Sequence, residues 1–417
     1  MRSRIIVPFL LGVIVSFYFF PVLFTFLPAG INSKMILAVI GALMFIWDSL
    51  KKDGFKFDNY VFGAAILAIL FSVSCYFSAV ENYTNDMTYA TYFVSFFTWL
   101  GGAYGVYGFL RMRYKKVDIH LIITYLMWVS VAQCISVLLI DNVAPFKLAV
   151  DSLFDVGQSY IEVMGRKYGI GAALDPAGVR FSIVLILIAH QLSTKVLKTG
   201  STRLILEYIV AFSFVSVIGN MVSRTTLVGM VLGLGYVLYY IARLENGLIQ
   251  SEQLKTIFLI AAFLVVSVPA VTYLYNNNPS FHDDFRFAFE GFFNWRETGE
   301  WRTDSTDKLN SVMWVWPQDP KTWFIGSGSF SDAIYSTDIG YCRFILYCGL
   351  LGFSIFCLFF IFNAFAFERK FQQGWLLTLI LLVLPFIIWI KVATDIFQIY
   401  AMFMCAEVAS EGDKIVL

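Results

Sequence analysis

Hydrophobic residues along the chain fall in long uninterrupted blocks, and polar residues gather between the blocks instead of alternating with apolar ones. A helix of about 20 apolar residues crosses the hydrocarbon core of a bilayer, whereas membrane β-strands alternate apolar and polar positions. The pattern therefore predicts an all-α polytopic membrane protein with about 12 transmembrane helices. The blocks that we expect to span the membrane are residues 5–28, 31–47, 60–80, 87–110, 119–140, 178–196, 204–220, 224–242, 256–275, 339–363, 375–391 and 396–410.

Composition supports this class and excludes a soluble protein. The 417 residues are 59% hydrophobic and only 14% charged, whereas soluble domains are about 25% charged. We expect one integral membrane domain over residues 1–417, with block 5–28 retained as its first span. The six cysteines lie in or beside apolar blocks and are interpreted as packing residues.

The distribution of lysine and arginine indicates the orientation, because cytoplasmic loops are enriched in both residues. With a cytoplasmic N-terminus, 17 of the 30 Lys and Arg fall in cytoplasmic segments, including Lys52, Lys56 and Lys414. The opposite orientation would place these cations outside. We therefore expect both termini in the cytoplasm. The net charge of +1 gives no general attraction for nucleic acid, and we expect no such partner.

Two connections are much longer than the others, at residues 141–177 and 276–338, and both fall on the outer side. Long loops without secondary structure of their own are uncommon unless they carry function. Any chemistry is therefore expected in these two loops.

The first loop ends in a glycine-rich basic stretch, residues 165–180. Arg166 and Lys167 precede glycines that allow close backbone approach, and Asp175 and Arg180 follow. Guanidinium groups and clustered N–H donors suit phosphate. We interpret the three cations as candidates for binding an anionic substrate, and Asp175 as a further candidate for contact with that substrate. The alternative is a tight turn whose cations face lipid head groups.

Arg224 lies in a connection of almost no length between two spans, with Ser223 and Thr225 beside it. An arginine at this depth is costly unless it has a partner or extends to the interface. We expect it to point into a polar cavity, with snorkelling as the alternative. The following span carries Gly229 and Gly233, a spacing typical of close helix packing.

The second long loop begins with an aromatic stretch, residues 281–295, which predicts an amphipathic helix in the interface. Apolar spacing over residues 301–316 predicts another helix, capped by Asp304 or Ser305. Arg302 would then stand beside the exposed N–H groups of a helix N-terminus, an arrangement suited to a diphosphate.

The loop closes with Gly326 and Gly328, which again permit close backbone approach, and with Asp338 and Tyr341 where the chain returns to the membrane. A carboxylate at this boundary can serve as a general base. The alternatives for Asp338 are a salt bridge with an arginine and an N-cap for span 339–363.

The order of these features resembles the O-antigen polymerase and ligase superfamily of bacterial inner membranes. The resemblance covers the topology and four short stretches. These are the Arg-x-x-Gly to Asp-Pro loop at 166–176, the Ser-Arg-Thr at 223–225, Arg302 followed by Gly-Ser-Gly at 326–328, and Asp-Ile-Gly-Tyr at 338–341 with Gly-Leu-Leu-Gly at 349–352.

The resemblance implies a fold like that of the C-type glycosyltransferases and a substrate of undecaprenyl-diphosphate-linked oligosaccharides, used at the periplasmic face without metal or cofactor. Arg166, Arg224 and Arg302 would hold the diphosphate, and Gly326, Gly328 and Tyr341 would line the site. Ligases of the superfamily usually carry a histidine where this chain has Asp338, so the polymerase is favoured. Membrane lipids and a chain-length regulator are the other expected partners.

Three other functions remain open at this point, one of which is a purely structural assembly subunit. An O-antigen ligase would transfer finished chains to lipid A-core. A flippase or transporter for lipid-linked glycans would place its charged residues near the midplane and often shows repeated halves. Here the candidate charges gather at the outer boundary instead.

Overall fold

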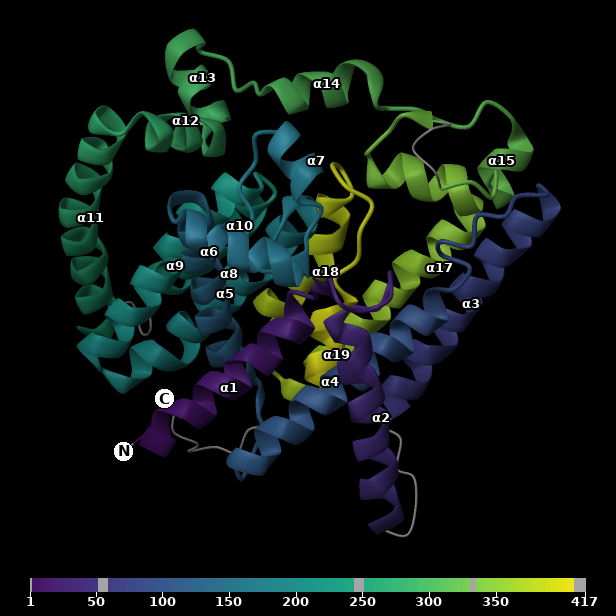
Figure 1. The fold of residues 1–417 in the computed structure, drawn as a ribbon, viewed down its shortest axis with the longest axis horizontal. Coiled ribbons are helices and arrows are strands. Elements are labelled where there is room, and N and C mark those ends of the chain that lie inside the picture. The colour runs from purple at the N-terminus through teal and green to yellow at the C-terminus, as the bar shows by residue number, and fades with distance from the viewer. Residues whose placement is uncertain (1, 52–58, 244–250, 331–334, 409–417) are drawn as a thin grey trace. The chain divides into compact units, whose positions relative to one another are not determined.

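The structure is a computed structural model that describes residues 2–51, 59–243, 251–330 and 335–408. Within these ranges the chain is helical apart from one two-stranded sheet (Figure 1). Eight helices are long and apolar enough to cross a membrane, at Ser33–Lys51, Asn59–Glu81, Tyr92–Arg113, Ile119–Asn142, Leu174–Thr199, Thr202–Val222, Gln253–Asn277 and Gly340–Phe371. An all-α polytopic membrane protein is thus confirmed. The count of twelve spans stays a prediction.

The first predicted span, 5–28, is helical only in its first part. Helix α1 (Arg2–Phe19) stops two residues before Pro21, which lacks a backbone N–H. Ser33 binds the backbone on both sides of this stop. Its hydroxyl donates to the carbonyl of Phe17 at 2.7 Å and accepts from the N–H of Val22 at 3.0 Å. The remaining residues of this block form a turn and a two-residue strand instead of membrane helix.

The last predicted span, 396–410, is also shorter than expected. Helix α19 (Phe397–Cys405) has nine residues, whereas a full crossing needs about 20. Positions 409 and 410 lie outside the described residues, as do Lys52, Lys56 and Lys414. Helices Thr226–Ala242 and Trp375–Ile388 are apolar but fall in the shorter class as well.

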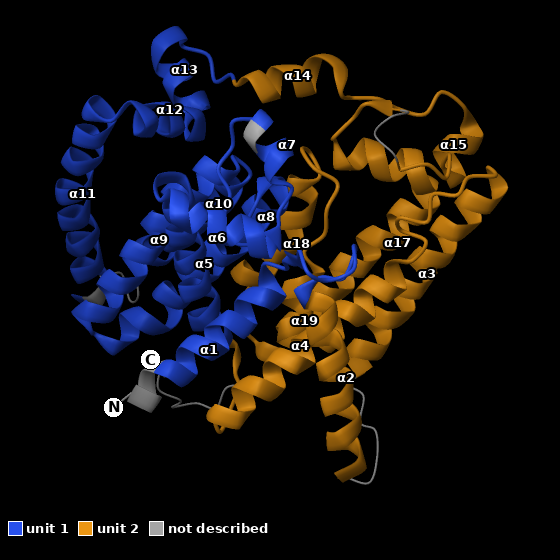
Figure 2. Ribbon diagram, in the orientation of Figure 1, with its two compact units in different colours: residues 1–33, 120–302, 414–417 blue, residues 34–119, 303–413 orange. Residues whose placement is uncertain are grey.

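The chain forms two compact units, each assembled from separate segments (Figure 2). Unit 1 comprises residues 1–33, 120–302 and 414–417, and unit 2 comprises residues 34–119 and 303–413. The elements of unit 1 are α1, β1 (Leu23–Phe24), α5 (Ile119–Asn142), α6 (Ala144–Leu153), β2 (Phe154–Asp155), α7 (Gln158–Val163), α8 (Leu174–Gln191), the π-helical turn η1 (Leu192–Val196), the 3-10 turn η2 (Leu197–Thr199), α9 (Thr202–Val222), α10 (Thr226–Ala242), α11 (Ser251–Asn277), α12 (Pro279–Ala288) and α13 (Glu290–Thr298). Those of unit 2 are α2 (Ser33–Lys51), α3 (Asn59–Glu81), α4 (Tyr92–Arg113), α14 (Asp304–Val312), α15 (Pro320–Ile325), α17 (Gly340–Phe371), α18 (Trp375–Ile388) and α19.

The centre of unit 1 is the close pair α8 and α10. Gly229 lets the two backbones touch, and its N–H donates to the hydroxyl of Ser182 at 3.1 Å. The same hydroxyl donates to the carbonyl of Thr225 at 2.9 Å. Small residues at such a crossing allow backbones to approach within a membrane. The predicted close packing at Gly229 is therefore confirmed.

The two long connections contain short helices of their own. In loop 141–177, helices α6 and α7 flank β2, which pairs antiparallel with β1. A small core of Ile140, Val150, Ile161 and Tyr168 fixes them to the end of α5. The loop thus has secondary structure of its own, and a function for it stays a prediction.

The predicted single helix over 281–295 is two helices, α12 and α13, because the backbone leaves the helical region at Phe289. Asn278 caps α12 by accepting from the N–H of Phe281 at 3.0 Å. Arg286 joins the two helices through Glu297 at 2.6 Å, and this hydrogen-bonded guanidinium lowers the pKa of the Glu297 carboxyl.

In unit 2 the predicted helix over 301–316 is confirmed as α14, but its cap is Thr303 and neither Asp304 nor Ser305. The Thr303 hydroxyl accepts from the N–H of Thr306 at 3.0 Å. Thr303 holds the extended backbone that an N-cap requires, whereas Asp304 already belongs to the first helical turn.

Candidate functional site

Arg166 and Arg224, which are 58 positions apart in the sequence, lie against the same aromatic ring. Their guanidinium carbons are 5.2 Å and 4.6 Å from the ring centroid of Phe287. Arg166 comes from the turn between α7 and α8, Arg224 from the turn between α9 and α10, and Phe287 from α12. Three connections of unit 1 therefore meet at one end of its helices.

The turn that carries Arg224 is held in place by Asp175, in the first turn of α8. One oxygen of Asp175 accepts from the hydroxyls of Ser223 at 2.7 Å and Thr225 at 2.8 Å. Gly178 leaves room for this contact, because a Cβ there would lie 2.6 Å from the Ser223 hydroxyl. Asp175 therefore orients Arg224, in addition to any role in substrate binding.

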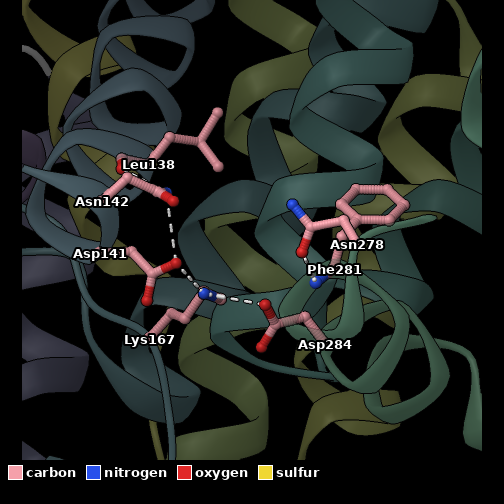
Figure 3. Close-up of polar contacts among 7 residues, drawn as sticks. All are labelled: Leu138, Asp141, Asn142, Lys167, Asn278, Phe281 and Asp284. Atoms are coloured by element: carbon pink, nitrogen blue, oxygen red, sulfur yellow. Dashed lines mark hydrogen bonds and ion pairs between the residues drawn. The ribbon is translucent and has the colours of Figure 1, made fainter. Parts of the chain in front are cut away.

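Lys167 lies beside Arg166 and between two carboxylates from different segments (Figure 3). Its ammonium forms an ion pair with Asp141 at the end of α5 and another, at 2.8 Å, with Asp284 of α12. Its side chain is only 9% exposed. These pairs fix the amine between the end of α5 and α12.

Arg224 forms an ion pair with Glu290, the first residue of α13. The two side chains are 13% and 18% exposed, so the pair is largely shielded from solvent. We name Arg166, Lys167 and Arg224 the basic cluster. One face of the α12–α13 segment covers it with a ring, Phe287, and two carboxylates, Asp284 and Glu290.

The basic cluster has the chemistry of an anion site. Guanidinium groups present fixed forks of N–H donors that match phosphate oxygens, and the ammonium adds a compact charge. Partial burial weakens screening by salt. The carboxylates that pair with Lys167 and Arg224 show that two of the three cations accept anionic oxygen ligands in this arrangement.

Two further predicted residues of unit 1, Arg180 and Arg302, contact other side chains. Arg180, on α8, lies 5.9 Å from the ring centroid of Phe20. Arg302 directly precedes the cap of α14, close to the predicted position, but its guanidinium is 60% exposed and pairs with Glu300 at 3.2 Å. A role in binding substrate stays a prediction for both.

Gly326 and Gly328 belong to unit 2, where they pack against backbone. Both have positive φ, and a Cβ on Gly328 would lie 2.7 Å from the Cα of Ala79. Gly328 donates its N–H to the carbonyl of Tyr347 at 3.0 Å. The close backbone approach that we inferred is thus used by helices α3 and α17, and contact with a substrate stays a prediction.

Asp338 is exposed, two residues before α17 begins, and no described residue binds its carboxylate. The N-cap of α17 is Ile339, so Asp338 is not the cap. Tyr341 is half-buried and donates its hydroxyl to the carbonyl of Phe386 at 2.7 Å. The basic role of Asp338 and the contact of Tyr341 with substrate stay predictions.

The sequence interpretation missed the anionic half of the site in unit 1. The sequence pattern assigns no function to Asp141 or Glu290. It includes Phe287 only in the aromatic stretch that we expect to form a helix in the membrane interface. The sequence contains one pattern that could have identified this group. Asp284, Phe287 and Glu290 follow each other at intervals of three residues, and this spacing places side chains on the same side of a helix.

The interpretation also missed Arg343 in the first turn of α17. Its guanidinium lies 4.0 Å from the ring centroid of Phe330 and donates to the carbonyl of the same residue at 2.8 Å. Asp86 accepts from the N–H of Phe330 at 2.7 Å. Arg343 and Asp86 together fix the end of the long loop in unit 2.

A comparison of the chain with known protein families, with curated proteins and with solved structures finds no match.

Proposed function

We propose that this protein is a membrane glycosyltransferase that polymerises oligosaccharide repeat units carried on undecaprenyl diphosphate. The observation that supports the proposal most is the basic cluster, in which Arg166 and Lys167 of one connection and Arg224 of another all contact helix α12 or its neighbour α13 in a helical membrane protein. A diphosphate at the end of a lipid is an anion that reaches such a position from within the bilayer.

Charge supports this choice of ligand. A diphosphate diester carries two negative charges, and the basic cluster holds the carboxylates of Asp284 and Glu290 in addition to Asp141. A bound diphosphate would replace the two carboxylates of the α12–α13 segment. The guanidinium forks would then bind phosphate oxygens in place of carboxylate oxygens.

The reaction transfers the growing glycan from its lipid carrier to an incoming lipid-linked repeat unit. A hydroxyl oxygen of the acceptor sugar attacks the anomeric carbon of the donor, and a new C–O bond forms with inversion. The bond between that carbon and the diphosphate oxygen breaks with both electrons going to the diphosphate. The acceptor proton passes to a base, and undecaprenyl diphosphate leaves.

The basic cluster would act on the leaving group. Negative charge grows on the bridging diphosphate oxygen as the bond breaks, and fixed cations stabilise that charge more in the transition state than in the ground state. Such preorganised stabilisation is commonly about 3–4 kcal/mol for one donor. Diphosphate is already a good leaving group, so this chemistry requires no metal.

Asp338 is our proposed base. Its carboxylate is exposed and forms no hydrogen bond or ion pair with a described residue. A carboxylate can take the proton of a sugar hydroxyl. Arg302 is our proposed additional ligand for the diphosphate. We further propose a fold like that of the C-type glycosyltransferases, a bacterial inner membrane location, cytoplasmic termini and a periplasmic site.

Arginine variants in cells test this proposal. In cells that lack the native copy, Arg166→Ala and Arg224→Ala should leave lipid carriers bearing single repeat units, and the ladder of long glycans on a gel should disappear. The matched control is Arg203→Ala, because Arg203 lies on α9, is 85% exposed and pairs along its own helix with Glu207. Immunoblots establish that each variant is present in the membrane. A normal ladder in both arginine variants would overturn the proposal.

A further inference from the structure

Unit 1 contains an open cleft of about 370 Å³ that none of the predicted site residues lines. Its walls come from two segments, seven residues between positions 23 and 30, which follow α1, and four residues from the end of α6 to the start of α7, namely Asp151, Phe154, Asp155 and Gln158. Clefts of about 300–1,000 Å³ are typical of sites for small organic ligands. The volume is large enough for a sugar.

The apolar side of the cleft consists of the paired strands β1 and β2. Phe24 and Phe154 are partners in the register of the two strands, and their ring centroids are 5.5 Å apart. Leu27 and Pro28 extend this surface. Aromatic faces of this kind pack against the C–H face of a pyranose ring.

The polar side of the cleft carries two carboxylates. One oxygen of Asp151 accepts from the hydroxyl of Tyr168 at 2.8 Å, and one oxygen of Asp155 accepts from the N–H of Gly157 at 3.0 Å. The second oxygen of each carboxylate accepts no hydrogen bond from a described residue. These oxygens are strong acceptors that remain available for hydroxyl or amide donors.

We propose that this cleft binds sugar residues of the glycan, and specifically neutral or amino sugars. The combination of aromatic rings with carboxylate acceptors matches the alternating C–H and O–H groups of such sugars. The described residues that line the cleft include no lysine or arginine. Two fixed negative charges would therefore repel uronic and other acidic sugars.

One residue links the cleft to the basic cluster within unit 1. Tyr168, which holds Asp151, follows Lys167 in the chain and belongs to the same small core as Val150 and Ile161. A lipid-linked sugar is joined to its diphosphate by a single bond, so a glycan that extends along this connection would reach the cleft. This inference rests on the proposed function and deepens it.

Variants of the cleft test the inference in cells, where the native glycan is present. The double variant Asp151→Asn with Asp155→Asn keeps the shape and removes the charge, and Ala29→Trp fills the cleft from its exposed rim. We expect each to reduce the rate of polymer formation by about tenfold or more. The control Asp283→Asn changes an acid on α12 that is 83% exposed, and it should leave the rate unchanged.

Binding measurements on the purified full-length protein separate the outcomes. The probes are inorganic pyrophosphate and a panel of lipid-free oligosaccharides that contains neutral, amino and acidic members. We expect the cleft variants to bind pyrophosphate like the unmodified protein, which also shows that they fold, and to lose affinity for neutral or amino oligosaccharides. Normal polymer formation in the cleft variants, or a preference for acidic oligosaccharides, would overturn the inference.

The two proposals fail in different ways. If Arg224→Ala abolishes polymer and the cleft variants do not, the cleft inference is wrong and the proposed function stands. If Arg166→Ala and Arg224→Ala leave polymer intact, the proposed function is wrong, whatever the cleft binds.

Discussion

Glu290 places a carboxylate on the arginine that we expect to bind substrate. Its ion pair with Arg224 is largely shielded from solvent. Salt weakens the attraction within a shielded ion pair less than within an exposed one, but taking each charge out of water also costs desolvation energy. In our account Glu290 holds the guanidinium in position while the site is empty and competes with a diphosphate for it.

The competition predicts a gain of affinity on removing the charge. We expect Glu290→Gln to bind inorganic pyrophosphate about tenfold more tightly, equivalent to about 1.4 kcal/mol, because the anion no longer displaces a carboxylate. Calorimetric titration of the purified protein measures this change.

The matched control for Glu290→Gln is Glu297→Gln, on the same helix, whose partner Arg286 is outside the basic cluster. It should leave pyrophosphate affinity unchanged. A weaker affinity in Glu290→Gln would show that Glu290 supports anion binding instead of competing with it.

For single residues, the sequence pattern identifies the arginines of the basic cluster but not the side chains that contact them. Arg166 and Arg224 stand out because arginines beside apolar spans need partners, and the structure brings both to Phe287. Their partners lie more than 60 residues further on, and only tertiary packing of α12 selects Phe287 and Glu290 from the many aromatic and acidic residues of that loop.

Helix α17 is interrupted within its apolar sequence. Gly349 has φ 63° and ψ −176°, a conformation that only glycine adopts readily. The interruption frees the carbonyls of Leu346 and Tyr347, and the end of the long loop binds both. Ser327 donates its N–H to the first at 2.7 Å, and Gly328 donates to the second at 3.0 Å.

Replacement of Gly349 tests this arrangement. A residue other than glycine at position 349 would hold a strained backbone conformation, which costs about 1–3 kcal/mol. Its Cβ would also clash with the backbone of Phe324. We expect Gly349→Ala to lower the free energy of unfolding by at least this amount, which thermal unfolding in detergent detects.

The control for Gly349→Ala is Gly235→Ala, because Gly235 is helical, lies in α10, and a Cβ added to it would meet nothing within 4 Å. Alanine is favoured over glycine within a helix by about 0.5–1 kcal/mol, so this variant should be neutral or more stable. Equal stability of the two variants would show that the break at Gly349 is not required.

The elements themselves are predictable where apolar blocks are long. Eight expected spans are helices of membrane length, since a continuous block leaves the backbone no other way to satisfy its hydrogen bonds in lipid. The ends are harder to predict. The stop of α1 two residues before Pro21 falls inside an apolar block, and the break at Phe289 falls inside an aromatic stretch.

In the whole molecule, the residues to which we assign the chemistry belong to both compact units. The basic cluster and the cleft belong to unit 1, whereas Asp338, Gly326 and Gly328 belong to unit 2. The proposed function therefore assigns roles to residues of both units. Sequence pattern identifies the loops that carry these residues, because polar stretches of such length stand out between apolar blocks. It does not indicate the two units, since each is built from separated segments.

Reconstitution tests the central claim, that the basic cluster binds the diphosphate of a lipid-linked glycan during transfer. The purified protein is placed in lipid vesicles with a radiolabelled undecaprenyl-diphosphate oligosaccharide, and glycan length and released carrier are measured. Our account predicts longer glycans with one undecaprenyl diphosphate released for each new bond, activity lost in Arg166→Ala and Arg224→Ala, and activity kept in Arg203→Ala. Movement of the unchanged substrate across the vesicle membrane, without bond formation, would contradict it.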